Sequence, residues 1–266
     1  MIKKIIAALS LFGAVFAGVN MFTEESEEDV SAVEDAVITE RVDESVGDAS
    51  AEYSGENEAE EEIPEAYMIE NFPVVLQMSE LPTGCEITAM TMVLNYYGFD
   101  VDKTEMAETY LPTVSSGLYY GNDGLLYGND LNEYFIGDPF TENGYVCGTG
   151  AIVTAATHYL TDVGSVLQAE DKTGTDAEEL YEIVSQDTPV VVWVTIGMAD
   201  RAETEGWYTG EGNYVEWSTN DHGAVLVGYT DTTVVIADPL AGMTEYEREQ
   251  FESVYESRGE KSVILM

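Results

Sequence analysis

The chain has 266 residues, 45% of them hydrophobic and 11% aromatic, which suffices for a domain of about 200 residues with a sizeable core. Its 52 acidic residues against 9 basic ones give a formal net charge of -43. A surface this acidic repels phosphate backbones and excludes nucleic acids as partners. The two cysteines, Cys85 and Cys147, are too few for a disulfide framework, and a single bridge between them is the structural alternative to a free thiol.

The first 22 residues have the composition of an export signal. Lys3 and Lys4 precede an apolar run, and Val15 and Ala17 mark a small-residue cleavage site. The run is also close to the roughly 17–25 residues that a membrane-spanning helix needs. A cleaved signal peptide and an N-terminal membrane anchor therefore both stay open. Either one places the rest of the chain outside the cytoplasm, secreted or at the cell surface, with membrane contact only through this segment.

Residues 23–66 have the composition of a linker. They are rich in Glu, Asp, Ser and Ala, with Arg41 as the one basic residue, and they lack periodic apolar positions. Such a segment buries too little surface to offset the entropy of ordering. We expect an acidic, disordered and extended spacer that holds a folded domain, residues 67–266, away from a membrane or cell wall.

A turn that leads into a helix near residue 85 organises the folded domain. Pro82 and Gly84 belong to the turn. Apolar residues then recur at helical spacing until Gly98 supplies a helix stop. Cys85 therefore falls in the first helical turn, where unpaired N–H groups and the positive end of the helix dipole favour a thiolate. This position predicts that Cys85 is a nucleophile.

The remaining elements follow in the order helices, then strands. The periodicity predicts helices over residues 103–111, 151–160, 176–185 and 244–255, and strands over residues 190–197, 223–229, 232–237 and 262–265. Trp207 and Trp217 flank a segment typical of a hairpin or loop. Residues 115–150 are rich in Gly, Asn and Tyr without a clear period, which suits a binding loop and a cover over the core equally well. Helices followed by an antiparallel sheet predict an α+β fold.

His222 is the candidate base. A cysteine nucleophile needs a base and usually a group that orients the base, and the chain has only two histidines. His158 lies in a short helix and is more simply a surface or packed residue. A three-residue loop at residues 229–231 would place His222 directly opposite Asp238, where Cβ atoms lie about 4.5–5.5 Å apart on one face. A loop of two or four residues would weaken this pairing, and Asp221 is the second candidate for orienting His222.

Gln77 is the candidate oxyanion donor. It lies eight residues before Cys85. A side-chain amide there, with a backbone N–H at the helix start, would hold the oxyanion of a tetrahedral intermediate, and one such donor is worth about 2.7–4 kcal/mol. Taken alone, Gln77 is an ordinary polar loop residue, so its role depends on its place ahead of Cys85.

Five segments carry a family resemblance. They are ELPTGCEITAMTMVLNYYGFDVDK, GNDLNEYFIGDPFTENGYVC, TPVVVWVTIGM, DHGAVLVGY and VVIADPLAG. From Phe72 to the C-terminus the chain thereby resembles the peptidase C39-like family. The resemblance implies a papain-like cysteine peptidase fold, in which an N-terminal helix with the cysteine packs on an antiparallel β-sheet. It also implies a cysteine, a histidine, an acidic residue or Asn, and a Gln ahead of the cysteine, which fall on Cys85, His222, Asp238 and Gln77.

These patterns predict an exported cysteine hydrolase. It would act as a peptidase on peptide or isopeptide bonds of a peptide or protein substrate, including one associated with the cell wall. No metal or organic cofactor is expected, and Cys147 is interpreted as structural. Two alternatives are a thiol amidase or acyltransferase with the same machinery, and a non-catalytic module that binds a surface component through its Tyr- and Trp-rich loops.

The charge state of Cys85 depends on opposing effects. The acidic domain and the adjacent Glu86 oppose a thiolate, whereas the helix end and a cationic His222 favour it. Because surface charge is screened beyond roughly 8 Å in physiological salt, we expect the favourable short-range interactions to win. Cys85 should then alkylate quickly near neutral pH, and His222→Ala should slow it.

Overall fold

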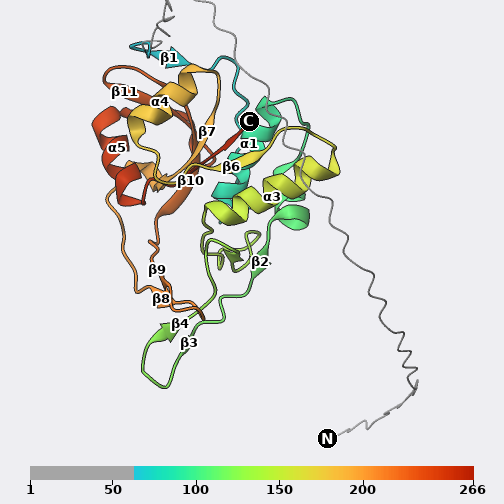
Figure 1. The fold of residues 1–266 in the computed structure, drawn as a ribbon, viewed down its shortest axis with the longest axis vertical. Coiled ribbons are helices and arrows are strands. Elements are labelled where there is room, and N and C mark those ends of the chain that lie inside the picture. Colours follow the sequence, from blue (N-terminus) through green and yellow to red (C-terminus); the bar gives the residue numbers. More distant parts are fainter. Residues whose placement is uncertain (1–62) are drawn as a thin grey trace, which may run out of the picture. The chain divides into compact units, whose positions relative to one another are not determined.

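The computed structural model describes residues 63–266 (Figure 1). The export segment, residues 1–22, lies outside the described residues, as does all but the C-terminal end of the linker at residues 23–66. Across the described range, none of the helices combines the length and the apolar composition that a bilayer crossing requires.

A seven-stranded antiparallel sheet forms the centre of the domain. Six strands run in the order β12-β11-β10-β7-β13-β6, and β1 pairs with one end of β10. The strands are β1 (Tyr67–Met68), β6 (Ala169–Asp171), β7 (Val190–Thr195), β10 (Asp221–Tyr229), β11 (Thr233–Asp238), β12 (Gly242–Glu247) and β13 (Ser262–Leu265). β7 and β10 are buried along their whole length, which explains their nearly continuous apolar, β-branched sequences. The four expected strands are confirmed, except that His222 lies inside β10 and not before it.

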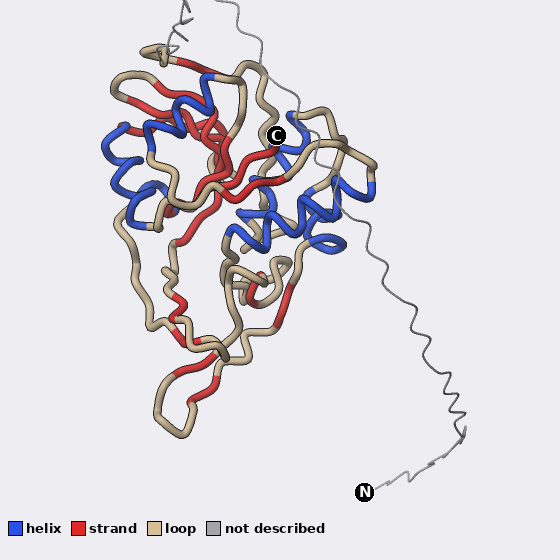
Figure 2. The backbone as a smooth tube through the Cα atoms, viewed as in Figure 1, coloured by secondary structure: helices blue, strands red, loops and turns tan. Residues whose placement is uncertain are grey.

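Helices cover both faces of this sheet (Figure 2). On one side lie α1 (Cys85–Tyr96) and α3 (Thr149–Asp162), and on the other α4 (Ala177–Ser185) and α5 (Arg248–Ser257). The α+β architecture, with the cysteine helix packed on an antiparallel sheet, is therefore confirmed. Instead of one buried stripe, every residue of α1 from Cys85 to Leu94 is buried, because sheet, loops and α3 surround it.

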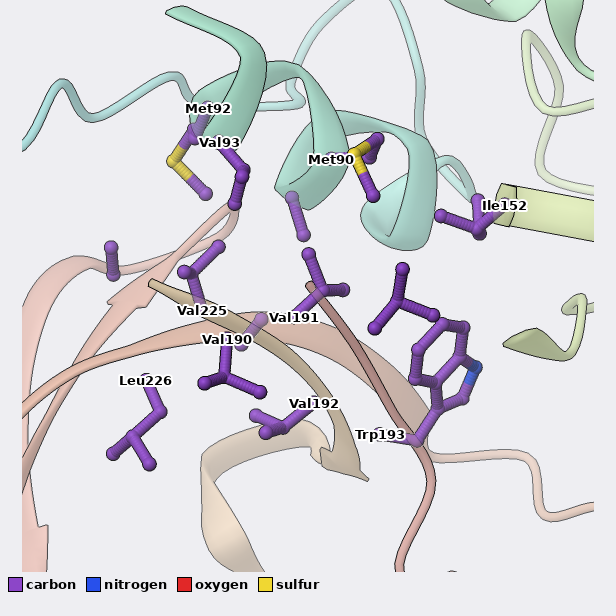
Figure 3. Packing of buried hydrophobic residues seen from close by; sticks show 14 of the residues in the cluster. Met90, Met92, Val93, Ile152, Val190, Val191, Val192, Trp193, Val225 and Leu226 are labelled. Carbon is purple, nitrogen blue, oxygen red and sulfur yellow. The ribbon is translucent and has the colours of Figure 1, made fainter. Parts of the chain in front are cut away.

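The contact between α1 and the sheet is aliphatic. Figure 3 shows Met90 and Val93 of α1 on the side of the sheet that Val191 and Val225 share. These two valines are paired across β7 and β10 and are fully buried. Burial of one such side chain contributes roughly 1.5–3 kcal/mol, so this layer fixes α1, and with it Cys85, against the start of β10.

Two expected helices differ from the structure. Residues 103–111 divide into a short helix, α2 (Lys103–Glu105), and a π-helical turn, η1 (Met106–Tyr110). Residues 244–247 belong to β12, so the helix expected from residue 244 begins only at α5. In β12 half-buried residues alternate with exposed ones, which include Glu245 and Glu247, and this is the period of two of an edge strand.

A smaller lobe contains most of the Gly-, Asn- and Tyr-rich segment. In it β2 (Thr113–Val114) pairs with β5 (Phe135–Ile136), and β3 (Tyr119–Tyr120), β4 (Leu126–Tyr127), β8 (Trp207–Tyr208) and β9 (Tyr214–Val215) form a four-stranded sheet. β8 and β9 make the hairpin expected between Trp207 and Trp217. Buried Leu131, Ile136, Val146, Trp207 and Val215 form a second core. This part of residues 115–150 therefore packs around a hydrophobic core of its own.

Candidate functional site

One pocket of about 280 Å³ at the start of α1 contains three of the four predicted site residues, Gln77, Cys85 and His222. The rest of its wall is Pro82, Thr83, Glu142, Gly144, Tyr145, Val146, Ile196, Trp217, Ser218, Thr219, Asp221 and Leu240. Asp238, the fourth, contacts His222 from outside this wall. The structure therefore brings all four side chains to one place. A slightly larger cavity of about 320 Å³, which includes Asp130 and Lys261, contains no cysteine or histidine.

Cys85 is the first residue of α1. Gly84 precedes it as the N-cap and offers no side chain to the free N–H groups of the first turn. The Cys85 side chain is buried, and its S–H donates to Oε2 of Glu86 over 3.3 Å. Cys85 and Cys147 are both free, so the alternative of a disulfide bridge is not what the structure contains.

The environment of Cys85 favours the thiol. Burial raises the pKa of Cys85 well above its ordinary value, and the adjacent Glu86 raises it further, while the backbone N–H of Gly223 acts in the opposite direction. The expectation of a thiolate is therefore wrong for this state of the site. The helix end, Glu86 and His222 are visible in the sequence, whereas the burial of Cys85 depends on the folded structure.

Asp238 orients the ring of His222. Nε2 of His222 lies 2.9 Å from Oδ1 of Asp238, and the same oxygen accepts the N–H groups of Leu240 at 2.7 Å and Ala241 at 3.2 Å. Burial opposes ionisation of Asp238, but these hydrogen bonds outweigh it and hold the pKa of Asp238 below its ordinary value. A carboxylate only accepts, so the proton of a neutral His222 belongs on Nε2. Within the described residues, Nδ1 has no hydrogen-bond partner.

A β-bulge in β10 brings Asp238 to the same face of the sheet as His222. Tyr229 pairs with the fifth residue after it, so four residues separate the paired positions, and the expected direct pairing of His222 with Asp238 is wrong. A bulge before Gly228 then shifts the register by one residue. If that register continues by one residue, Asp238 lies opposite Ala224. Ala224 and His222 are two residues apart in β10, so their side chains share a face of the sheet. Asp238 and His222 are therefore diagonal neighbours, at a distance that long side chains span. Without the bulge, Asp238 would point to the other face.

Gln77 lines the pocket, but its donors are occupied. Nε2 donates to the carbonyl oxygens of Leu81 at 3.0 Å and Pro82 at 3.1 Å. Oε1 is buried and has no hydrogen-bond partner within the described residues. An oxyanion role therefore requires the amide to exchange one of these carbonyls for the substrate oxygen.

The other candidates have structural contacts. Asp221 forms an ion pair with Arg258, whose Nε lies 2.6 Å from Oδ1, and so it does not orient His222. His158 is exposed on α3. Cys147 is buried, and its carbonyl accepts the indole N–H of Trp193 over 2.8 Å. In residues 63–266, no group of three or more His, Cys, Asp and Glu side chains is arranged to hold a metal ion.

Sequence reasoning missed that the side chain of Glu86 is completely buried beside Cys85. Helical spacing gives no signal for this contact, because adjacent side chains on a helix do not normally face each other. The pocket walls from the smaller lobe, Tyr145 and Trp217, were also missed, since residues far apart in sequence supply them.

Comparison with known proteins gives a family and similar proteins of related sequence and fold. Residues 69–263 match the model of the Peptidase_C39 like family. The uncharacterized protein YvpB of Bacillus subtilis (strain 168) is 29% identical over 189 residues, which is 70% of this chain and 70% of that protein. A crystal structure of a Bacillus anthracis protein assigned to the C39-like peptidases is 32% identical, covers 76% of this chain and 98% of its own, and superposes with a TM-score of 0.66.

Proposed function

Because the chain belongs to the Peptidase_C39 like family, we propose that it is an exported cysteine hydrolase that cleaves peptide or isopeptide bonds. The observation that carries the proposal is the hydrogen bond between His222 and Asp238 beside a pocket that Cys85 lines. An imidazole that is oriented on one nitrogen and unpartnered on the other is what a cysteine needs as its base. Export rests on the composition of residues 1–22 alone, and cell fractionation of a tagged full chain tests it.

The proposed reaction begins with the thiol. The S–H bond of Cys85 breaks as its proton moves to Nδ1 of His222, and the carboxylate of Asp238 stabilises the imidazolium. The thiolate attacks the substrate carbonyl carbon, and the oxyanion is held by free N–H groups at the start of α1 and by Gln77. His222 then returns the proton to the leaving amine, and water hydrolyses the acyl-enzyme. An amine acceptor in place of water would make the same site an acyltransferase.

Covalent labelling tests this proposal. A p-nitrophenyl ester should acylate the wild-type protein under reducing conditions, with release of nitrophenol and a mass increase on the peptide that contains Cys85. Cys85→Ala should abolish both signals, because no other free cysteine lines the pocket in the described part of the chain. Cys147→Ala is the matched control and should keep the labelling. If the wild-type protein is not acylated at any pH, this result would contradict the proposed hydrolase activity and favour a binding module.

One observation favours that second candidate, a surface-binding module. A row of tyrosine rings crosses the four-stranded sheet, with centroid distances of 5.7, 6.3 and 5.1 Å. The row consists of Tyr119, Tyr127, Tyr208 and Tyr214, and its two end residues are exposed. Binding that persists in Cys85→Ala but is lost when Tyr119 and Tyr214 become alanine would support a recognition role.

Gln77→Ala should lower acylation by the ester about 10²–10³-fold, since a single oxyanion donor is worth this much. Alkylation of Cys85 by iodoacetamide should not change, because displacement of iodide forms no tetrahedral oxyanion. The ratio of the two rates therefore isolates the oxyanion role. An equal fall of both rates would show that Gln77 only supports the turn whose carbonyls it binds.

A further inference from the structure

Glu86 is a buried acid in direct contact with the nucleophile, and the mechanism above does not use it. Its side chain is completely buried. Oε2 accepts the S–H of Cys85 and Oε1 accepts the backbone N–H of Cys147, each over 3.3 Å. Since adjacent side chains on a helix do not normally face each other, the surrounding packing must impose this contact.

Gly223 in β10 provides that packing. A Cβ atom at this position would lie 2.7 Å from Cα and 2.9 Å from Cγ of Glu86. Only glycine lets β10 approach the first turn of α1 so closely. The same approach brings His222, the residue before Gly223, to the pocket that contains Cys85.

No cation compensates the carboxyl group of Glu86. The titratable groups that act on it are Cys85 of α1, Asp221 of β10, and Cys147 of the segment before α3. Asp221 is already paired with Arg258. Among the described residues, no Lys, Arg or His lies within ion-pair distance of Glu86. Burial accordingly raises the pKa of Glu86 to about 7, although its hydrogen bonds from Cys85 and Cys147 act in the opposite direction.

Two anions in contact inside such a site are unfavourable, so a carboxylate at Glu86 and a thiolate at Cys85 exclude each other. We propose that Glu86 is a positioning residue that controls the thiol proton of Cys85. As a carboxylate it accepts the S–H and keeps the thiol unreactive. As a neutral acid it donates its O–H to the sulfur while the thiol proton passes to Nδ1 of His222. The inference rests on the proposed function for the partnership of Cys85 with His222.

This arrangement predicts an unusual pH dependence. The reactivity of an ordinary cysteine rises with pH as the thiol ionises. Here the ionisation of Glu86 near pH 7 opposes that rise. The alkylation rate of wild-type Cys85 should therefore flatten or fall between about pH 6 and pH 8.

Glu86→Gln should remove this bend in the pH profile of the alkylation rate. The amide is neutral at every pH and can donate an N–H to the thiolate, so the rate should rise monotonically and exceed that of the wild type about 10-fold near pH 8. Iodoacetamide rates are read from the mass of the Cys85 peptide, which separates Cys85 from Cys147. Glu249→Gln is the matched control, because it removes an exposed carboxylate from the second position of α5, outside the pocket, and its profile should follow the wild type.

Identical pH profiles for the wild type and Glu86→Gln would overturn the inference. A wild-type profile that rises without a bend would also overturn it, and this measurement does not depend on the folding of a variant. Alkylation requires no hydrolysis, so failure of the proposed function is a separate result: a bent profile without acylation by the ester would contradict the hydrolase alone.

Discussion

Asp238→Ala is expected to slow acylation of Cys85 about 10³–10⁴-fold, whereas Asp238→Asn should slow it only about 10–100-fold. The difference follows from a single oxygen. Oδ1 of Asp238 accepts all three hydrogen bonds, from Nε2 of His222 and from the N–H groups of Leu240 and Ala241. The carbonyl oxygen of asparagine can take the same position, so the ring keeps its orientation and its tautomer. What asparagine loses is the charge that stabilises the imidazolium.

Alanine at this position loses both effects. It leaves three donors without an acceptor, and the one that is buried, Nε2 of His222, costs about 1–3 kcal/mol when unsatisfied. The ring of His222 is then free to turn away from the pocket. Acylation rates by the p-nitrophenyl ester, together with urea unfolding of each variant, separate the chemical loss from the loss of stability. In serine proteases an Asp-to-Asn change at the corresponding position costs about 10⁴-fold because histidine takes the wrong tautomer. A loss of that size in Asp238→Asn would contradict the single-oxygen argument.

Cys85, His222 and Asp238 could be selected from the sequence because each lies near the start or end of an element. The turn at Pro82 and Gly84 marks the start of α1, and a strand pattern marks the neighbourhood of His222. Such patterns predict local structure reliably, because the conformations of turn residues and the effect of apolar periodicity have local physical causes. The strands β7, β10, β11 and β13 were recognisable for the same reason.

The register and the electrostatics could not be predicted in this way. The bulge before Gly228 depends on the pairing of β10 with β11. No residue pattern in either strand predicts its position. Burial of Glu86 depends on the glycine of β10 that faces α1, more than a hundred residues away in the chain. The raised pKa of Cys85 follows from that burial, so it too depends on tertiary contacts. Residues 244–247, the C-terminal part of β12, were mistaken for the start of a helix because charged residues at alternate positions obscure the weak apolar pattern of the strand.

Arg258→Met is expected to destabilise the domain by about 3–5 kcal/mol near pH 8, because it leaves the carboxylate of Asp221 buried without its partner. Nε and Nη2 of Arg258 lie 2.6 and 2.7 Å from the two oxygens of Asp221, and both side chains are buried. Among residues 63–266, the backbone N–H of Ser218 would be the one remaining hydrogen-bond donor to this carboxylate. Burial already raises the pKa of Asp221, and Arg258 opposes this rise. Without Arg258 the carboxyl should be neutral in mild acid, so the destabilisation should shrink as the pH falls toward about 5.

Urea unfolding at both pH values measures this effect, and two further variants decide its cause. Asp221→Asn combined with Arg258→Met removes the buried charge and should recover most of the lost stability. Lys172→Met breaks the partly exposed pair of Lys172 with Glu170, at 3.1 Å, and should cost no more than about 1 kcal/mol. The loss of stability in Arg258→Met could instead be independent of pH and remain in the double variant. That result would mean that lost packing of the arginine, and not the unpaired charge of Asp221, causes the instability. Because Asp221 directly precedes His222 in β10, the unpaired carboxylate should also slow acylation of Cys85 in Arg258→Met, and the double variant should restore the rate.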